Sequence, residues 1–127
     1  MGAWMNLRQS LLRALTRHRD IKLCILFGSR AAGRGSSDSD PDIAIVMEKP
    51  LPAERYLKFS EEFSSETNRG IDLMDLMTAT GPILKQALST GIIIQNRNRS
   101  LYARLISRML FNQSDMMPLY YRNLGER

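Results

Sequence analysis

Two short apolar segments, separated by a long polar connection, constrain this chain more than any other feature. Residues 21–27 (IKLCILF) and 42–47 (DIAIVM) are rich in β-branched and other apolar side chains, and they are too short for typical helices. We therefore predict two buried strands. The connection, GSRAAGRGSSDSDP, consists largely of glycine, serine and aspartate, which is typical of a turn-rich loop.

The rest of the chain alternates between helical and extended patterns. Apolar residues at helical spacing predict four helices, and two further apolar runs predict strands. The predicted helices cover about residues 4–19, 52–67, 80–90 and 99–111, and the further strands cover 70–77 and 92–95. This order of elements predicts an α/β or α+β fold, in which helices cover a sheet.

The helical spacing also predicts which side chains face the core. The predicted inward residues are Trp4, Leu7, Leu11, Leu12 and Leu15 in the first helix, Ala53, Tyr56, Leu57, Ser60 and Phe63 in the second, and Leu101, Leu105, Ile106, Met109 and Leu110 in the last.

Length and composition indicate one soluble globular domain over residues 1–127. The chain is 43% hydrophobic and 24% charged, and no apolar run is long enough to cross a bilayer, so we expect no membrane partner. Cys24 is the single cysteine, which excludes an internal disulfide and favours a cytoplasmic location. The net charge of +5 is spread without a dense basic run, and we expect no direct binding of nucleic acid.

Acidic residues at the starts of two strands form the candidate site. Asp40 and Asp42 lie two residues apart, so in an extended chain their carboxylates point to the same side. Two adjacent carboxylates repel each other unless a cation lies between them, and Mg²⁺ prefers such oxygen ligands. Asp72 and Asp75 interrupt the apolar strand at 70–77; because they are three residues apart, at most one of them can join the same cluster.

A phosphate-binding turn precedes these acids. Gly28 and Ser29 end the first strand and offer backbone N–H groups and a hydroxyl to a phosphate. Three acids on neighbouring strands beside such a turn favour a metal-dependent site for phosphoryl or nucleotidyl transfer.

The spacing of these residues resembles a known family. Gly28-Ser29, ten intervening residues and then Asp40-Pro41-Asp42 match the GS-x10-DxD motif of the nucleotidyltransferase superfamily, whose fold is a mixed β-sheet flanked by helices. More narrowly, the chain is similar to the minimal nucleotidyltransferases that serve as MNT antitoxins in HEPN/MNT toxin–antitoxin pairs. The later segment IDLMDL, followed by ILKQALSTGIII, extends the resemblance over nearly the whole chain and places the third acid at Asp72.

The resemblance implies a protein adenylyltransferase that uses ATP as co-substrate and Mg²⁺ as cofactor. Asp40, Asp42 and Asp72 would be both the metal ligands and the catalytic acids, with Asp72 helping to remove the acceptor proton. The acceptor would be a tyrosine of a HEPN ribonuclease toxin, and attachment of AMP to this tyrosine would inactivate the toxin.

The same resemblance implies that Gly28, Ser29 and Arg30 would bind the nucleotide. Pro41 departs from the family pattern, in which a branched apolar or aromatic residue usually separates the paired acids. Two alternatives therefore stay open: an antitoxin that neutralises its toxin by binding alone, and a nucleotidyltransferase acting on a small molecule.

Overall fold

The computed structural model describes residues 2–28, 40–79 and 81–112, without the side chains of residues 2–5 and 112. Helices and strands follow one another in the predicted order, with ends within a few residues of the predicted ones. The elements are α1 (Gly2–Thr16), β1 (Leu23–Phe27), β2 (Asp42–Val46), α2 (Ala53–Thr67), β3 (Asp72–Asp75), α3 (Gly81–Thr90), β4 (Ile92–Asn96) and α4 (Arg99–Asn112).

The four strands form one mixed sheet in the order β3-β2-β1-β4. β1 pairs antiparallel with β2 and β4, whereas β2 and β3 are parallel and are connected through α2. Because β2 and β3 run in the same direction, both begin at one edge of the sheet, next to the end of β1. This edge carries the predicted site residues.

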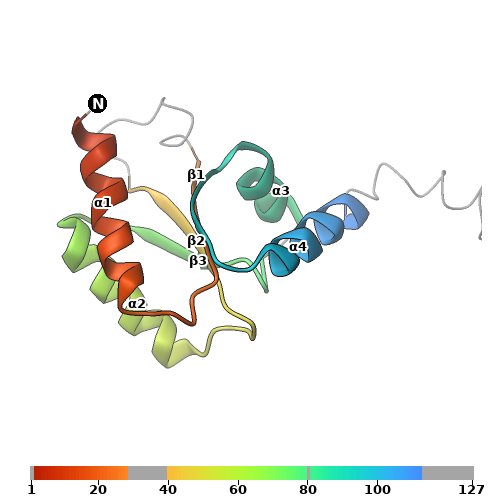
Figure 1. Ribbon diagram of the computed structural model, residues 1–127, viewed down its shortest axis with the longest axis horizontal. Coiled ribbons are helices and arrows are strands. Elements are labelled where there is room, and N and C mark those ends of the chain that lie inside the picture. Colours follow the sequence, from red (N-terminus) through yellow and green to blue (C-terminus); the bar gives the residue numbers. More distant parts are fainter. Residues whose placement is uncertain (1, 29–39, 80, 113–127) are drawn as a thin grey trace, which may run out of the picture.

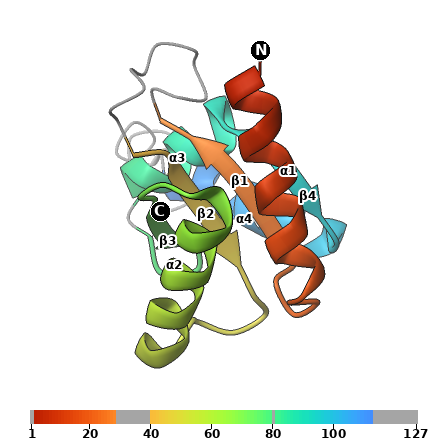
Figure 2. The same cartoon turned by 90° about the vertical axis from the view of Figure 1, so that its left-hand side faces the viewer.

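Helices cover both faces of the sheet. Helices α1 and α2 lie on one side, and α3 and α4 lie on the other (Figures 1 and 2). All five residues of β1 are buried, which explains why this strand is a continuous apolar run and not an alternating one. The prediction of a helix-covered α/β sheet is confirmed.

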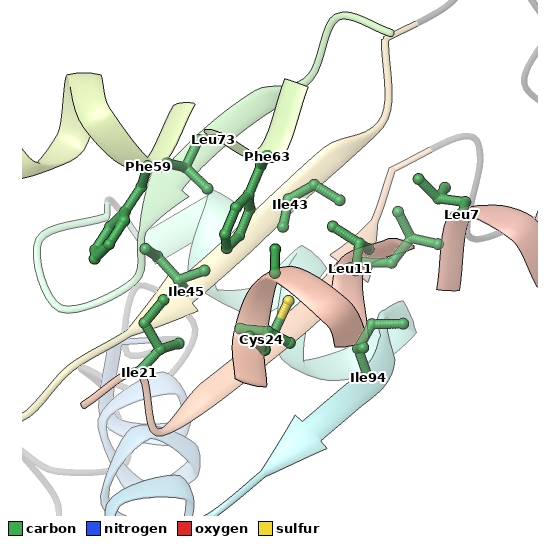
Figure 3. Packing of buried hydrophobic residues seen from close by; sticks show 13 residues of the cluster. Leu7, Leu11, Ile21, Cys24, Ile43, Ile45, Phe59, Phe63, Leu73 and Ile94 are labelled. Carbon is green, nitrogen blue, oxygen red and sulfur yellow. The ribbon is translucent and has the colours of Figure 1, made fainter. Parts of the chain in front are cut away.

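The core divides into two clusters, one on each face. In the cluster between the sheet and α1 and α2, Cys24 and Ile43 pack with Leu11 and Phe63 (Figure 3). Leu23, Ile25 and Phe27 of the same β1 strand point the other way, into the cluster beneath α3 and α4. The strand positions therefore contribute alternately to the two cores.

The predicted inner faces of two helices need correction. In α2, Phe59 and Phe63 are buried, whereas Leu57 is 60% exposed and Ala53 is also exposed. The helix is rotated so that its two phenylalanines face the sheet, where they bury more apolar area than Leu57 would. In α4, Leu110 was expected to face inward but is 52% exposed, because the inward row ends at Met109.

Ion pairs join α1 to α2 across their outer faces. Arg13 contacts Glu66 at 2.9 Å, and Arg17 contacts Glu62 at 2.8 Å and Glu66 at 2.7 Å. His18 adds a 2.7 Å contact from its Nε2 to Glu62. These side chains are partly exposed, so each pair stabilises the fold only weakly, but together they fix how the two helices lie against each other.

Within the described residues, no helix combines the length and the apolar character needed to span a bilayer.

Candidate functional site

The starts of β2 and β3 bring two of the predicted acids together. Asp42 and Asp72 occupy paired positions, each at the first residue of its strand. The backbone N–H of Asp72 donates a hydrogen bond of 2.9 Å to the carbonyl of Pro41. Pro41 has no N–H to donate, but its carbonyl extends the pairing one residue before the strand, so proline is tolerated there.

The carboxyls of Asp42 and Asp72 lie within hydrogen-bonding reach of each other. Burial raises the pKa of Asp42 from 3.8 to about 6, with further contributions from the hydrogen bond to Asp72 and from the charges of Asp72 and Asp40. A hydrogen bond between two carboxyls requires a proton on one of them. A raised pKa is therefore expected for a partly buried carboxyl that lies close to other acids.

Two glycines allow the chain to pass close to these acids. Gly28, at the end of β1, has a φ of +86°, and a Cβ at this position would collide with Oδ2 of Asp42. Gly70 lies before β3, and a Cβ there would lie 2.9 Å from Oδ1 of Asp40. Since β1 and β3 flank β2 on opposite sides, the acids lie between Gly28 and Gly70.

Asp75 has a structural role. Its carboxylate accepts hydrogen bonds from the backbone N–H of Leu51 at 2.8 Å and of Met77 at 2.9 Å. It therefore ties the loop after β2 to the end of β3, three residues away from Asp72. The prediction that only one of these two acids can join the cluster is confirmed.

The carboxylate oxygens of Asp40, Asp42 and Asp72 are the type of ligand that a hard divalent cation such as Mg²⁺ prefers. Asp40 is exposed, and its charge acts on Asp42, which hydrogen-bonds to Asp72. Among the described residues, no three acidic, histidine or cysteine side chains converge closely enough to hold a metal ion as they stand. Below the raised pKa of Asp42, a proton on its carboxyl relieves the repulsion between the acids, and a cation would relieve the same repulsion at higher pH. Ser29 and Arg30, the other predicted nucleotide ligands, lie outside the described residues.

Comparison with protein families agrees with the fold and the motif. Residues 9–100 match the family described as "Polymerase beta, Nucleotidyltransferase". This match covers most of the chain and includes both of the strands that carry the acids. The chain therefore belongs to the polymerase beta nucleotidyltransferase family.

One curated relative is similar to this chain in sequence over more than half of its length. Over 76 residues the chain is 30% identical to the "Probable protein adenylyltransferase MntA" of Haemophilus influenzae; the match covers 59% of this chain and 67% of the relative.

Solved structures share the fold over nearly the whole chain. One is a toxin–antitoxin structure with AMP-PNP, with a TM-score of 0.72 and 20% identity, covering 93% of this chain and 98% of the other. Another is a chain from a structure of a tri-AMPylated Shewanella oneidensis HEPN toxin in complex with MNT antitoxin. Its TM-score is 0.68 at 20% identity, and the match covers 97% of this chain and 99% of the other. At this identity the structures establish the fold alone.

Sequence reasoning missed one site residue. The sequence predicts Gly70 only as the first residue of a strand, whereas in the structure it lies against Asp40 and makes room for that carboxylate. A glycine two residues before the third acid is the available signal, but it is easily taken for an ordinary turn residue.

Proposed function

We propose that this chain is an antitoxin that transfers AMP from ATP to a tyrosine hydroxyl of a partner HEPN ribonuclease toxin. The observation that carries the proposal is the contact between Asp42 and Asp72 beside Gly28, in a chain 30% identical to a probable protein adenylyltransferase. The relatives solved with AMP-PNP and with an AMPylated HEPN toxin support the same reaction and the same kind of partner.

The proposed reaction assigns a role to each residue of the site. Asp40, Asp42 and Asp72 would hold Mg²⁺, which supplies charge neutralisation for the phosphates and lowers the pKa of the acceptor hydroxyl. Backbone N–H groups at Gly28 and Ser29 would bind the triphosphate, next to Arg30.

In the chemical step, the tyrosine oxygen attacks the α-phosphorus of ATP. The bond from that phosphorus to the bridging oxygen breaks, and pyrophosphate leaves with the bond electrons. The hydroxyl proton passes to the carboxylate of Asp72 and then to water. The product is a toxin tyrosine that carries AMP through a phosphodiester bond.

An antitoxin that acts by binding alone is the second candidate. Two observations favour it: Pro41 separates the paired acids, and no three of the described acids converge on one point. The two candidates differ in what they require of the carboxylates, because a binding surface works without them.

Growth rescue in cells distinguishes the two. The toxin is expressed with the wild-type protein or with the Asp40→Ala/Asp42→Ala double variant at matched protein levels. The transferase predicts that the double variant fails to restore growth while it is still pulled down with the toxin. Rescue by the double variant equal to that by wild type would refute the transferase and support binding alone.

A further inference from the structure

A surface cavity of about 210 Å³ lies between the first turns of α1 and the C-terminal end of α2. Its lining is formed by Asn6, Leu7, Ser10, Thr67 and Arg69. Leu7 is only 4% exposed and Ser10 is 8% exposed, whereas Asn6 is exposed and lies at the mouth. The cavity thus combines an apolar wall with hydroxyl groups and one guanidinium.

The cavity adjoins the acidic cluster. Arg69, in its lining, is followed directly by Gly70, which lies against the carboxylate of Asp40. Figure 2 shows α1 beginning at the end of the molecule where β1 ends. α2 runs back from the end of β2 to the start of β3, so it also finishes at this end.

The topology gives the acids two distinct sides. Gly28 approaches Asp42 from the β1 side, where the proposed reaction binds the triphosphate. Gly70 approaches Asp40 from the β3 side, and the cavity lies on the face of the sheet that α1 and α2 cover. Phosphoryl and nucleotidyl transfer place the attacking and leaving oxygens roughly in line, on opposite sides of the phosphorus. With pyrophosphate leaving on the Gly28 side, the acceptor would enter from the side of Gly70, and Arg69 of the cavity directly precedes Gly70.

The size of the cavity indicates what it holds. Sites for whole small molecules usually measure about 300–1,000 Å³, so 210 Å³ is small for ATP and suits a single side chain. An aromatic ring packs well against an aliphatic wall such as Leu7 and against a guanidinium plane such as that of Arg69.

Hydrogen bonds hold two lining side chains in place. Ser10 Oγ accepts a bond of 3.0 Å from Nη2 of Arg13, and Thr67 Oγ1 donates a bond of 2.8 Å to the carbonyl of Phe63. The lining is therefore already ordered, which lowers the entropic cost of binding.

We propose that this cavity is the acceptor pocket, which receives the tyrosine side chain of the partner and directs its hydroxyl to the acidic cluster. The inference rests on the proposed function and adds to it the place where the acceptor binds. Asn6 and Arg69 are then binding residues for the protein substrate and not for ATP.

Steady-state kinetics with the HEPN toxin as the varied substrate test the proposal. Asn6→Trp places a large side chain at the mouth of the cavity, and Lys58→Trp, at an exposed position of α2, is the matched control. We expect Asn6→Trp to raise the KM for the toxin about tenfold. AMP-PNP affinity, measured by calorimetric titration, should stay within about twofold of wild type, and Lys58→Trp should change neither quantity. Arg69→Met, which removes the guanidinium but keeps a long side chain, should also raise this KM.

Each other outcome overturns the inference. Weaker AMP-PNP binding with an unchanged toxin KM would assign the cavity to the nucleotide. A normal KM in Asn6→Trp and in Arg69→Met, with unfolding midpoints like that of wild type, would show that the cavity has no part in acceptor binding. Failure of the proposed function is recognised separately, from the wild-type protein alone. If wild type transfers no AMP to the toxin, the proposed function fails, and the acceptor pocket is refuted with it.

Discussion

The crowding of Asp42 and Asp72 predicts that the site destabilises the protein when no cation is bound. The folded protein holds the Asp42 proton up to a pKa of about 6, whereas an ordinary aspartate releases it at 3.8. The folded state therefore binds more protons than the unfolded chain between these values, and it loses stability as the pH rises through them. Asp42→Asn removes the titrating group, so the variant should not suffer this loss.

The size of the effect follows from the pKa. A tenfold change in proton affinity corresponds to about 1.4 kcal/mol, so raising the pKa of Asp42 from 3.8 to about 6 costs at most about 3 kcal/mol above that range. Asp42 is only partly buried, and water screens part of the repulsion. We expect Asp42→Asn to exceed wild type by about 1–2 kcal/mol in unfolding free energy near pH 8, and by much less near pH 3.

Urea unfolding at several pH values, in the presence of a chelator, measures this difference. Glu61→Gln, a change at an exposed carboxylate of α2, is the matched control and should show no comparable gain. Adding Mg²⁺ near pH 8 should stabilise wild type more than Asp42→Asn, because the cation offsets the repulsion between the ionised carboxylates. An Asp42→Asn variant no more stable than wild type near pH 8 would show that the acids do not destabilise the folded protein.

Three further predictions concern single residues around the site and the core. Gly28→Ala should cost about 2 kcal/mol in urea unfolding and abolish AMP transfer, because φ is +86° and the new Cβ meets Asp42; an unchanged midpoint would contradict the close contact. Asp75→Ala should cost about 2 kcal/mol through two lost backbone hydrogen bonds, yet retain most AMP transfer in a mass-spectrometric assay; loss of transfer in a folded variant would place Asp75 in the reaction. Cys24 should resist a thiol-specific reagent until the protein unfolds, because burial raises its pKa to about 12; rapid labelling of the folded protein would refute this.

Much of the fold could be predicted because its strands are apolar runs with clear ends. Residues 23–27 are buried on both faces, and Gly28 ends the run, so length and composition were enough to identify a strand. The helices followed from apolar spacing, but the rotation of α2 did not. Leu57 and Phe59 are both apolar, and only packing against the sheet determines which of them is buried.

The sequence was enough to name the residues of the candidate site, but not to predict how they contact one another. The spacing from Gly28 to Asp42 carried the resemblance to the family; the strand pattern left Asp72 and Asp75 open, and the resemblance placed the third acid at Asp72. The parallel pairing that places Asp42 opposite Asp72 depends on contacts between distant segments. Local sequence does not encode those contacts, so the close placement of the two acids became visible only in three dimensions.

The intact mass of the HEPN toxin, taken after incubation with this protein, ATP and Mg²⁺, tests the central claim most directly. Matched samples contain the Asp40→Ala/Asp42→Ala double variant, or wild type without nucleotide. The account predicts mass gains in whole AMP units with wild type and ATP, and no gain in either matched sample. An unmodified toxin that nevertheless forms a stable complex with the wild-type protein would contradict it.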